Sequence, residues 1–173
     1  MPTERSDRKM LIKFLFGVAT VAFTSFCGYL LARKYRQKRE FFTQFKEFND
    51  RFISEVSYYR RPIGEFIANY VYRGEFNRLL EEYFTGISEG KTLGLILESA
   101  EYSFLKQEEK RVVEDYFLML GKGDSSSQKG YCLAAKDGIV KLQTEAELTC
   151  KRYADLYVKL GFLCGLLILI LIL

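Results

Sequence analysis

The chain has 173 residues, a formal net charge of +4 and no histidine. Its basic excess lies in one short stretch, because residues 40–159 hold 17 Lys/Arg against 20 Asp/Glu, and this balance argues against a nucleic-acid-binding surface. Without histidine the usual general base and the commonest metal ligand are missing. We therefore predict no enzymatic activity, no catalytic residue, no metal or cofactor site and no small-molecule substrate.

An uncharged run of 19 residues, 14–32, follows a short tail of residues 1–13. About 20 apolar residues span the hydrocarbon core of a bilayer as a helix. A cleaved signal peptide is the alternative, but its apolar region covers only about 7–15 residues and ends at a small-residue cleavage site. This run instead continues directly into basic residues, so we predict a retained transmembrane helix over 14–32.

A basic collar follows this run and consists of Arg33, Lys34, Arg36, Lys38 and Arg39. Cations beside a membrane helix suit anionic headgroups, so we expect the collar to lie at the surface of a lipid bilayer. Basic flanks also favour the cytoplasmic side for the central segment, residues 33–159, although the tail is itself basic.

The central segment has helical periodicity throughout, which predicts an all-α bundle domain. A first stripe recurs at steps of three and four: Phe41, Phe45, Phe48, Phe52, Val56 and Tyr59. Pro62 is predicted to end or kink this helix. Further helices are predicted over 63–71 and 76–84, then a loop over 85–92, then helical patterns at 93–104 and 112–120 that form one helix or two.

The most regular pattern follows a glycine-containing break at residues 121–123, where Asp124 and Ser125 are candidate caps. Steps of three and four then continue for four heptads through Cys132, Ala135, Ile139, Leu142, Ala146, Thr149, Tyr153, Leu156 and Leu160. This seam predicts one helix from about Ser125 into the terminal apolar run. Such a seam forms a coiled coil with a partner or packs inside the bundle, and we favour packing inside the bundle.

The second uncharged run is residues 160–173, which we predict to be a transmembrane helix. Its 14 residues rise only about 21 Å as a helix, so it spans the core if Lys159 lies at the interface or the bilayer thins locally. A half-inserted tail is the alternative.

The segment 86–92, GISEGKT, resembles a phosphate-binding loop. However, that motif has four residues between its glycines and follows a strand, whereas this segment has three and follows helical spacing. We interpret it as an ordinary connection between helices.

Three short segments resemble the stage III sporulation protein AB family, and the likeness extends over nearly the whole chain from Met10. They are Leu120-Gly121-Lys122-Gly123-Asp124 with Gln128, similar to LG-x-x-D-x-x-x-Q; residues 160–165, similar to LGFL-x-G; and residues 59–63, similar to Y-x-x-TPL. The chain departs from the family pattern at Arg61, where threonine is usual, at Ile63, where leucine is usual, and in having no tryptophan in its middle helices.

The resemblance implies a platform-like, non-enzymatic membrane component of the mother-cell-to-forespore channel, a secretion-type complex needed for endospore formation. It implies a membrane on the mother-cell side, with the central domain in the cytoplasm. It also implies a helical domain similar to those of the inner-membrane platform protein of type II secretion and type IV pilus machines. The partners would be a secretion-type ATPase and other membrane proteins of the complex.

Loops at the membrane-distal end of a bundle are accessible to a soluble partner. We therefore expect partner contacts at Arg60, Arg61, Pro62, Gly121, Asp124 and Gln128. The simplest interpretation of Gly121, Asp124 and Gln128 is nevertheless a helix break and cap.

Two other function classes are open from the sequence. A holin-like pore-former would use the small residues Gly17, Ala19, Gly28, Gly161 and Gly165 for helix association. A membrane-tethered regulator would bind one soluble enzyme.

Overall fold

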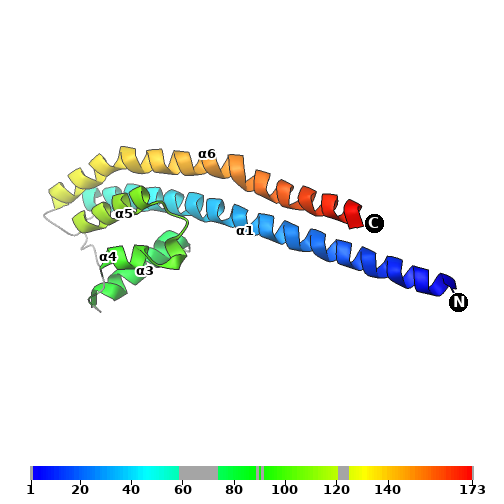
Figure 1. Cartoon of the computed structure of the whole chain (residues 1–173). Coiled ribbons are helices and arrows are strands. Elements are labelled where there is room, and N and C mark those ends of the chain that lie inside the picture. The colour runs from blue at the N-terminus through cyan, green and yellow to red at the C-terminus, as the bar shows by residue number, and fades with distance from the viewer. Residues whose placement is uncertain (1, 59–73, 89, 91, 121–124, 173) are drawn as a thin grey trace. The chain divides into compact units, whose positions relative to one another are not determined.

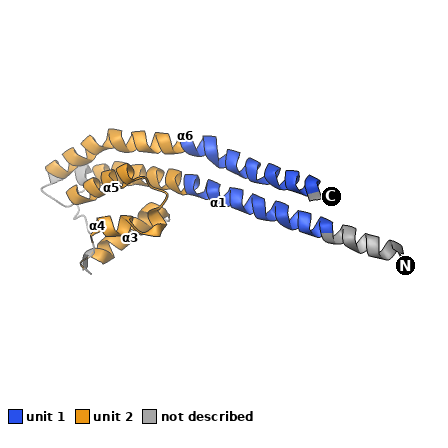
Figure 2. Ribbon diagram, in the orientation of Figure 1, with its two compact units in different colours: residues 1–36, 148–173 blue, residues 37–147 orange. Residues whose placement is uncertain are grey.

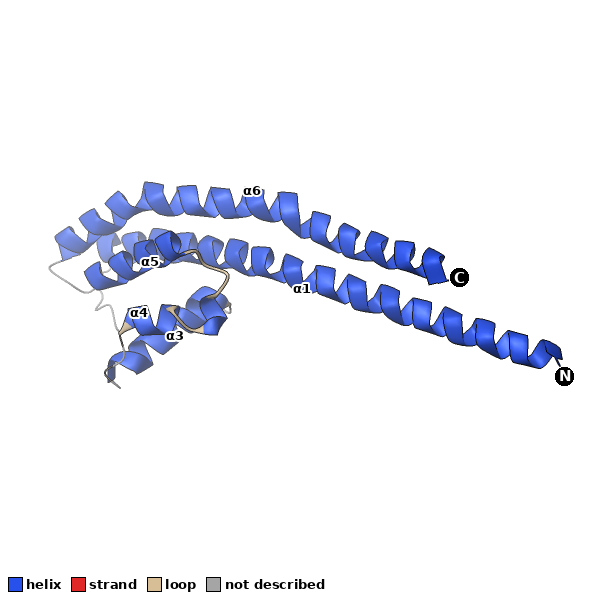
Figure 3. Cartoon of the chain, in the orientation of Figure 1, coloured by secondary structure: helices blue, strands red, loops and turns tan. Residues whose placement is uncertain are grey.

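The chain is described by a computed structural model that covers residues 2–58, 74–88, 90, 92–120 and 125–172. Over these residues Figure 3 shows helices joined by loops and no strand, which confirms the all-α prediction. The elements are α1 (Pro2–Tyr58), α3 (Glu75–Ser88), α4 (Leu93–Leu97), the 3₁₀ helix η1 (Ala100–Tyr102), α5 (Gln107–Met119) and α6 (Ser125–Ile172), labelled in Figure 1.

The chain divides into two compact units, coloured separately in Figure 2. Unit 1 combines residues 1–36 with residues 148–173, and unit 2 comprises residues 37–147. Because α1 and α6 each run through residues of both units, each unit contains part of both long helices.

Phenylalanines of α1 form the centre of unit 2. The predicted stripe is confirmed at Phe41, Phe45, Phe48 and Phe52, which are completely or almost completely buried. Phe42, outside the stripe, is also completely buried. Neighbouring positions on a helix point about 100° apart, so two faces of α1 are covered in this unit.

Helix α3 attaches to α1 at its first turn. Phe76 packs against Phe41 and Phe45, with ring centroids 5.4 and 5.0 Å apart. Its backbone N–H donates to Oε1 of Gln44, 3.1 Å away, which satisfies one of the donors that a helix start leaves free. Gly74 precedes this turn with φ of 140°, a conformation that favours glycine.

The structure decides two sequence predictions in this region. The predicted loop is wrong for residues 85–88, which are the last turn of α3. The patterns at 93–104 and 112–120 form separate pieces, because α4 and η1 end before α5 begins. Helix α5 begins where the Lys106 N–H donates to the Glu109 carboxylate at 2.8 Å.

Helix α6 is one continuous helix from Ser125 to Ile172, as predicted. Cys132, Ile139 and Ala146 of its seam are buried in unit 2, so the seam packs inside the bundle there. In unit 1 the heptad prediction is wrong, since Leu156 and Leu160 are about half exposed while Cys150 and Ala154 are buried. A straight helix has 3.6 residues per turn and drifts from a strict heptad, so the buried face passes to other positions.

Candidate membrane anchor and partner-contact surfaces

Unit 1 is an antiparallel pair of apolar helices. Gly28 of α1 faces Tyr157 and Gly161 of α6, whereas Gly17 faces Leu169. Residue numbers therefore fall along α6 as they rise along α1. In this register α6 lies beside the first apolar run, residues 14–32, from the basic end of the run at least as far as Gly17.

Glycine allows the two helices of this pair to approach closely. A Cβ on Gly28 would lie 2.5 Å from the carbonyl oxygen of Tyr157, and a Cβ on Gly161 would lie 2.6 Å from that of Thr24. At Gly165 the same atom would lie 2.8 Å from the Cα of Val21. These obstacles are main-chain atoms, which cannot swing away, so no larger residue fits without separating the helices.

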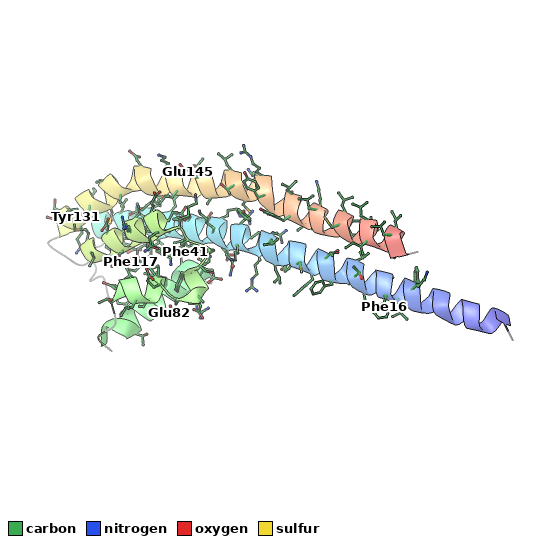
Figure 4. All side chains as sticks on the ribbon, in the orientation of Figure 1. Phe16, Phe41, Glu82, Phe117, Tyr131 and Glu145 are labelled. Carbon is green, nitrogen blue, oxygen red and sulfur yellow. The ribbon has the colours of Figure 1, made fainter. Side chains whose placement is uncertain are left out.

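The outward surface of the pair is apolar. Its exposed large side chains include Phe14, Leu15, Phe16, Phe23, Phe26, Leu163, Leu167, Ile170 and Leu171. Phe16 projects from α1 and is 69% exposed (Figure 4). Both helices are long and apolar enough to cross a membrane, which suggests membrane association.

Aromatic and basic residues gather at one end of this pair. Tyr35 stacks on Tyr153 and Tyr157, with ring centroids 5.6 and 5.7 Å apart, and the Arg36 guanidinium lies 5.7 Å from the ring centroid of Tyr29. Tyrosine and arginine of this kind are enriched where a membrane helix meets water. The register places Lys159 level with Gly28, about one turn below the end of the first run, which is within reach of a snorkelling lysine.

The residues predicted at the membrane interface differ in their surroundings. Lys159 is exposed, and so are four collar residues: Arg33, Lys34, Arg36 and Arg39. The ammonium of Lys38 instead lies 2.5 Å from the Glu109 carboxylate, and both side chains are largely buried in unit 2. Lys38 therefore holds α5 to α1.

Unit 2 contains a buried polar cluster on three helices. Asn49 of α1 donates to the Cys132 carbonyl oxygen of α6 at 3.2 Å and accepts from the Tyr116 hydroxyl of α5 at 3.0 Å. Burial raises the pKa of the Cys132 thiol, so this thiol stays protonated at neutral pH. The cluster fixes how α1, α5 and α6 are aligned.

A groove of about 290 Å³ lies between α5 and α6 in unit 2. Phe45 and Phe52 line it from α1, and Gln128 lines it from α6. Gln128 is only 6% exposed, so its amide lies in the wall of the groove and is no surface group.

Comparison with known proteins gives one decisive result. The family model for stage III sporulation protein AB matches residues 13–173, nearly the whole chain. The chain belongs to this family. No curated protein and no solved structure matches it.

Membership of the stage III sporulation protein AB family implies a role in sporulation, and the match indicates no enzymatic domain. Among the described residues no cluster of three or more Cys, Asp or Glu is placed to hold a metal ion. Residues 86–88 of the segment that resembles a phosphate-binding loop belong to α3, so a helix precedes its second glycine.

Of the six predicted partner-contact residues, the structure describes one. Gln128 lies in the α5–α6 groove, whereas Arg60, Arg61, Pro62, Gly121 and Asp124 lie outside the described residues. Sequence reasoning missed the groove and the Asn49 cluster, because each joins helices far apart in the chain. The one available signal was an asparagine, Asn49, directly after Phe48 of the α1 stripe.

Proposed function

We propose that this chain is a platform-like, non-enzymatic membrane component of the mother-cell-to-forespore channel, a secretion-type complex that endospore formation needs. Its partners would be a secretion-type ATPase and other membrane proteins of the complex. The observation that carries the proposal is the family match over residues 13–173. The ATPase and the platform role come from the resemblance described above.

The apolar pair in unit 1 supports a membrane anchor that crosses the bilayer twice. Its outward side chains are apolar, and its glycines are used in contacts between α1 and α6. The 19 residues of the first run rise about 28 Å, close to the roughly 30 Å of a hydrocarbon core. Because α6 runs beside this run, a full crossing is favoured over a half-inserted tail.

The bundle in unit 2 would then lie on the cytoplasmic side, where an ATPase can reach it. The exposed cations Arg33, Lys34 and Arg36 at the end of the first run support this orientation. Both long helices pass from the apolar pair into the bundle as continuous helix. A partner bound to the bundle would thus be tied to the membrane through two helices.

A pore-former is the second candidate, and the packing of unit 1 favours it less. Gly28, Gly161 and Gly165, the small residues that would associate neighbouring copies, are occupied by contacts within one chain. The exposed face carries large apolar side chains, which suit lipid better than a water-filled channel.

The proposal is tested by binding. The full chain in lipid nanodiscs is mixed with a purified secretion-type ATPase from the same organism, and binding is measured by biolayer interferometry against empty nanodiscs. We expect saturable binding, no ATP turnover by the chain alone, and weaker binding after Arg60→Glu with Arg61→Glu. A folded chain that binds no ATPase would overturn the platform role, and dye leakage from liposomes would then test the pore-former.

A further inference from the structure

The groove between α5 and α6 has an apolar interior with an exposed apolar rim. Val112 and Met119 of α5 line it and are 40% and 45% exposed, and Tyr131 of α6 lines it and is 48% exposed. Tyr131 lies near the start of α6 in Figure 4. Residues of three helices therefore surround the groove, and a molecule bound in it would bury these side chains.

Two polar residues line this groove. Gln128 is more than nine-tenths buried in the groove wall. Asp115, also in the lining, is exposed and forms no ion pair with a described residue.

The groove wall has no side chain at one position, Gly138. A Cβ on Gly138 would meet no atom within 4 Å, although Gly138 lines the groove. The main chain of an approaching helix can come close to α6 at such a position.

We propose that this α5–α6 groove binds an amphipathic helix of another protein. The apolar face of that helix fills the groove, and a lysine or arginine of the helix pairs with Asp115. Charge complementarity selects a basic helix, because Asp115 is the one charged residue among the described residues of the lining. A groove between helices is a common receptor for such a segment, since the added helix completes a bundle. The inference rests on the proposed function, because it names the surface at which a partner is met.

The probe is a fluorescent helical peptide of leucine and lysine, compared with a peptide in which glutamate replaces each lysine. Binding is followed by anisotropy with the full chain in phosphatidylcholine nanodiscs, with empty nanodiscs as the baseline. We expect saturable binding of the lysine peptide and weaker binding of the glutamate peptide. Asp115→Asn should raise the Kd of the lysine peptide by about threefold to tenfold, and Gln128→Ala should raise it as well.

Two glycines of α6 provide a matched pair of variants. Gly138 lines the groove and Gly130 does not, and a Cβ at either position meets no atom within 4 Å. Gly138→Leu should fill the groove and raise the Kd by about tenfold or more, whereas Gly130→Leu should leave it unchanged. Both variants should keep full helical circular dichroism, because leucine favours helix over glycine.

Three results would overturn the proposal: no saturable binding, equal binding of the two peptides, or equal effects of the two leucine variants. Self-association of the wild-type chain that Gly138→Leu abolishes would assign the groove to a second copy instead. Failure of the peptide with intact ATPase binding would reject the groove alone. Failure of ATPase binding with intact peptide binding would reject the platform role alone.

Discussion

Gly28 and Gly161 determine how closely the two apolar helices approach in unit 1. The sequence showed these glycines and their use in helix association, but it left open whether they meet inside one chain or between copies. The answer depends on the register between residues more than 130 positions apart, and no local pattern encodes such a register. The structure gives that register through the contacts of each glycine.

Replacing Gly28 tests this packing. Gly28→Ile would push a side chain against the Tyr157 carbonyl oxygen and should destabilise the helix pair by about 1–3 kcal/mol. Ala22→Ile is the control, because Ala22 is exposed on the same helix. Thermal unfolding in detergent, followed by circular dichroism, should show a lower midpoint for Gly28→Ile alone. Equal midpoints for the two variants would refute the close approach.

Asp50 provides a pH-dependent test. Burial acts to raise its pKa, but hydrogen bonds from Lys136 and Lys46, 2.9 and 3.1 Å away, outweigh this and hold the pKa below its usual value. The folded state therefore favours the carboxylate. This stabilisation is present above the unfolded pKa of about 3.9 and is lost as the pH falls through the lower folded pKa.

Asp50→Asn should accordingly lower stability at neutral pH by less than about 1 kcal/mol, because all three side chains are partly exposed. The difference from wild type should vanish in acid. It is measured as the difference in unfolding midpoint across a pH series. A difference that persists below the folded pKa would show that charge is not its cause.

At the scale of elements, helix periodicity predicted most of what local sequence can encode. The phenylalanine stripe of α1, most of α3 and the long α6 all follow from it. The extent of α3 and the additional burial of Phe42 did not, because they depend on which helices cover a given face. The Asn49 cluster was equally inaccessible, since its hydrogen bonds join residues 67 and 83 positions apart.

Glu109 links two elements, because it accepts from the backbone N–H of Lys106, the residue just before α5, and pairs with Lys38 of α1. Glu109→Ala would leave the Lys38 ammonium buried without a counter-charge and should destabilise the fold by about 3–5 kcal/mol. Glu109→Gln keeps an acceptor for the helix start and should have a smaller effect. Glu108→Ala, at an exposed neighbour, is the control. Thermal unfolding that does not separate Glu109→Ala from this control would contradict the assigned role.

At the scale of the whole molecule, sequence reasoning reached the family and the all-α class, and both are confirmed. It reached little of the partner surface. Five of the six expected contact residues lie outside the described structure, and the sixth lies in a groove wall. A loop motif indicates that a connection is present, but the shape of a groove depends on how three helices pack together.

The side of the membrane at which the bundle lies decides whether an ATP-driven partner can reach it. Single cysteines are introduced as Ser126→Cys in unit 2 and Thr3→Cys in the tail, and intact cells are treated with a membrane-impermeant thiol reagent, with wild type as the baseline. If both apolar helices cross the membrane, Thr3→Cys is labelled in intact cells and Ser126→Cys only after the cells are opened. Labelling of Ser126→Cys in intact cells would place the bundle outside the cytoplasm, away from any ATP-driven partner, and would contradict the account.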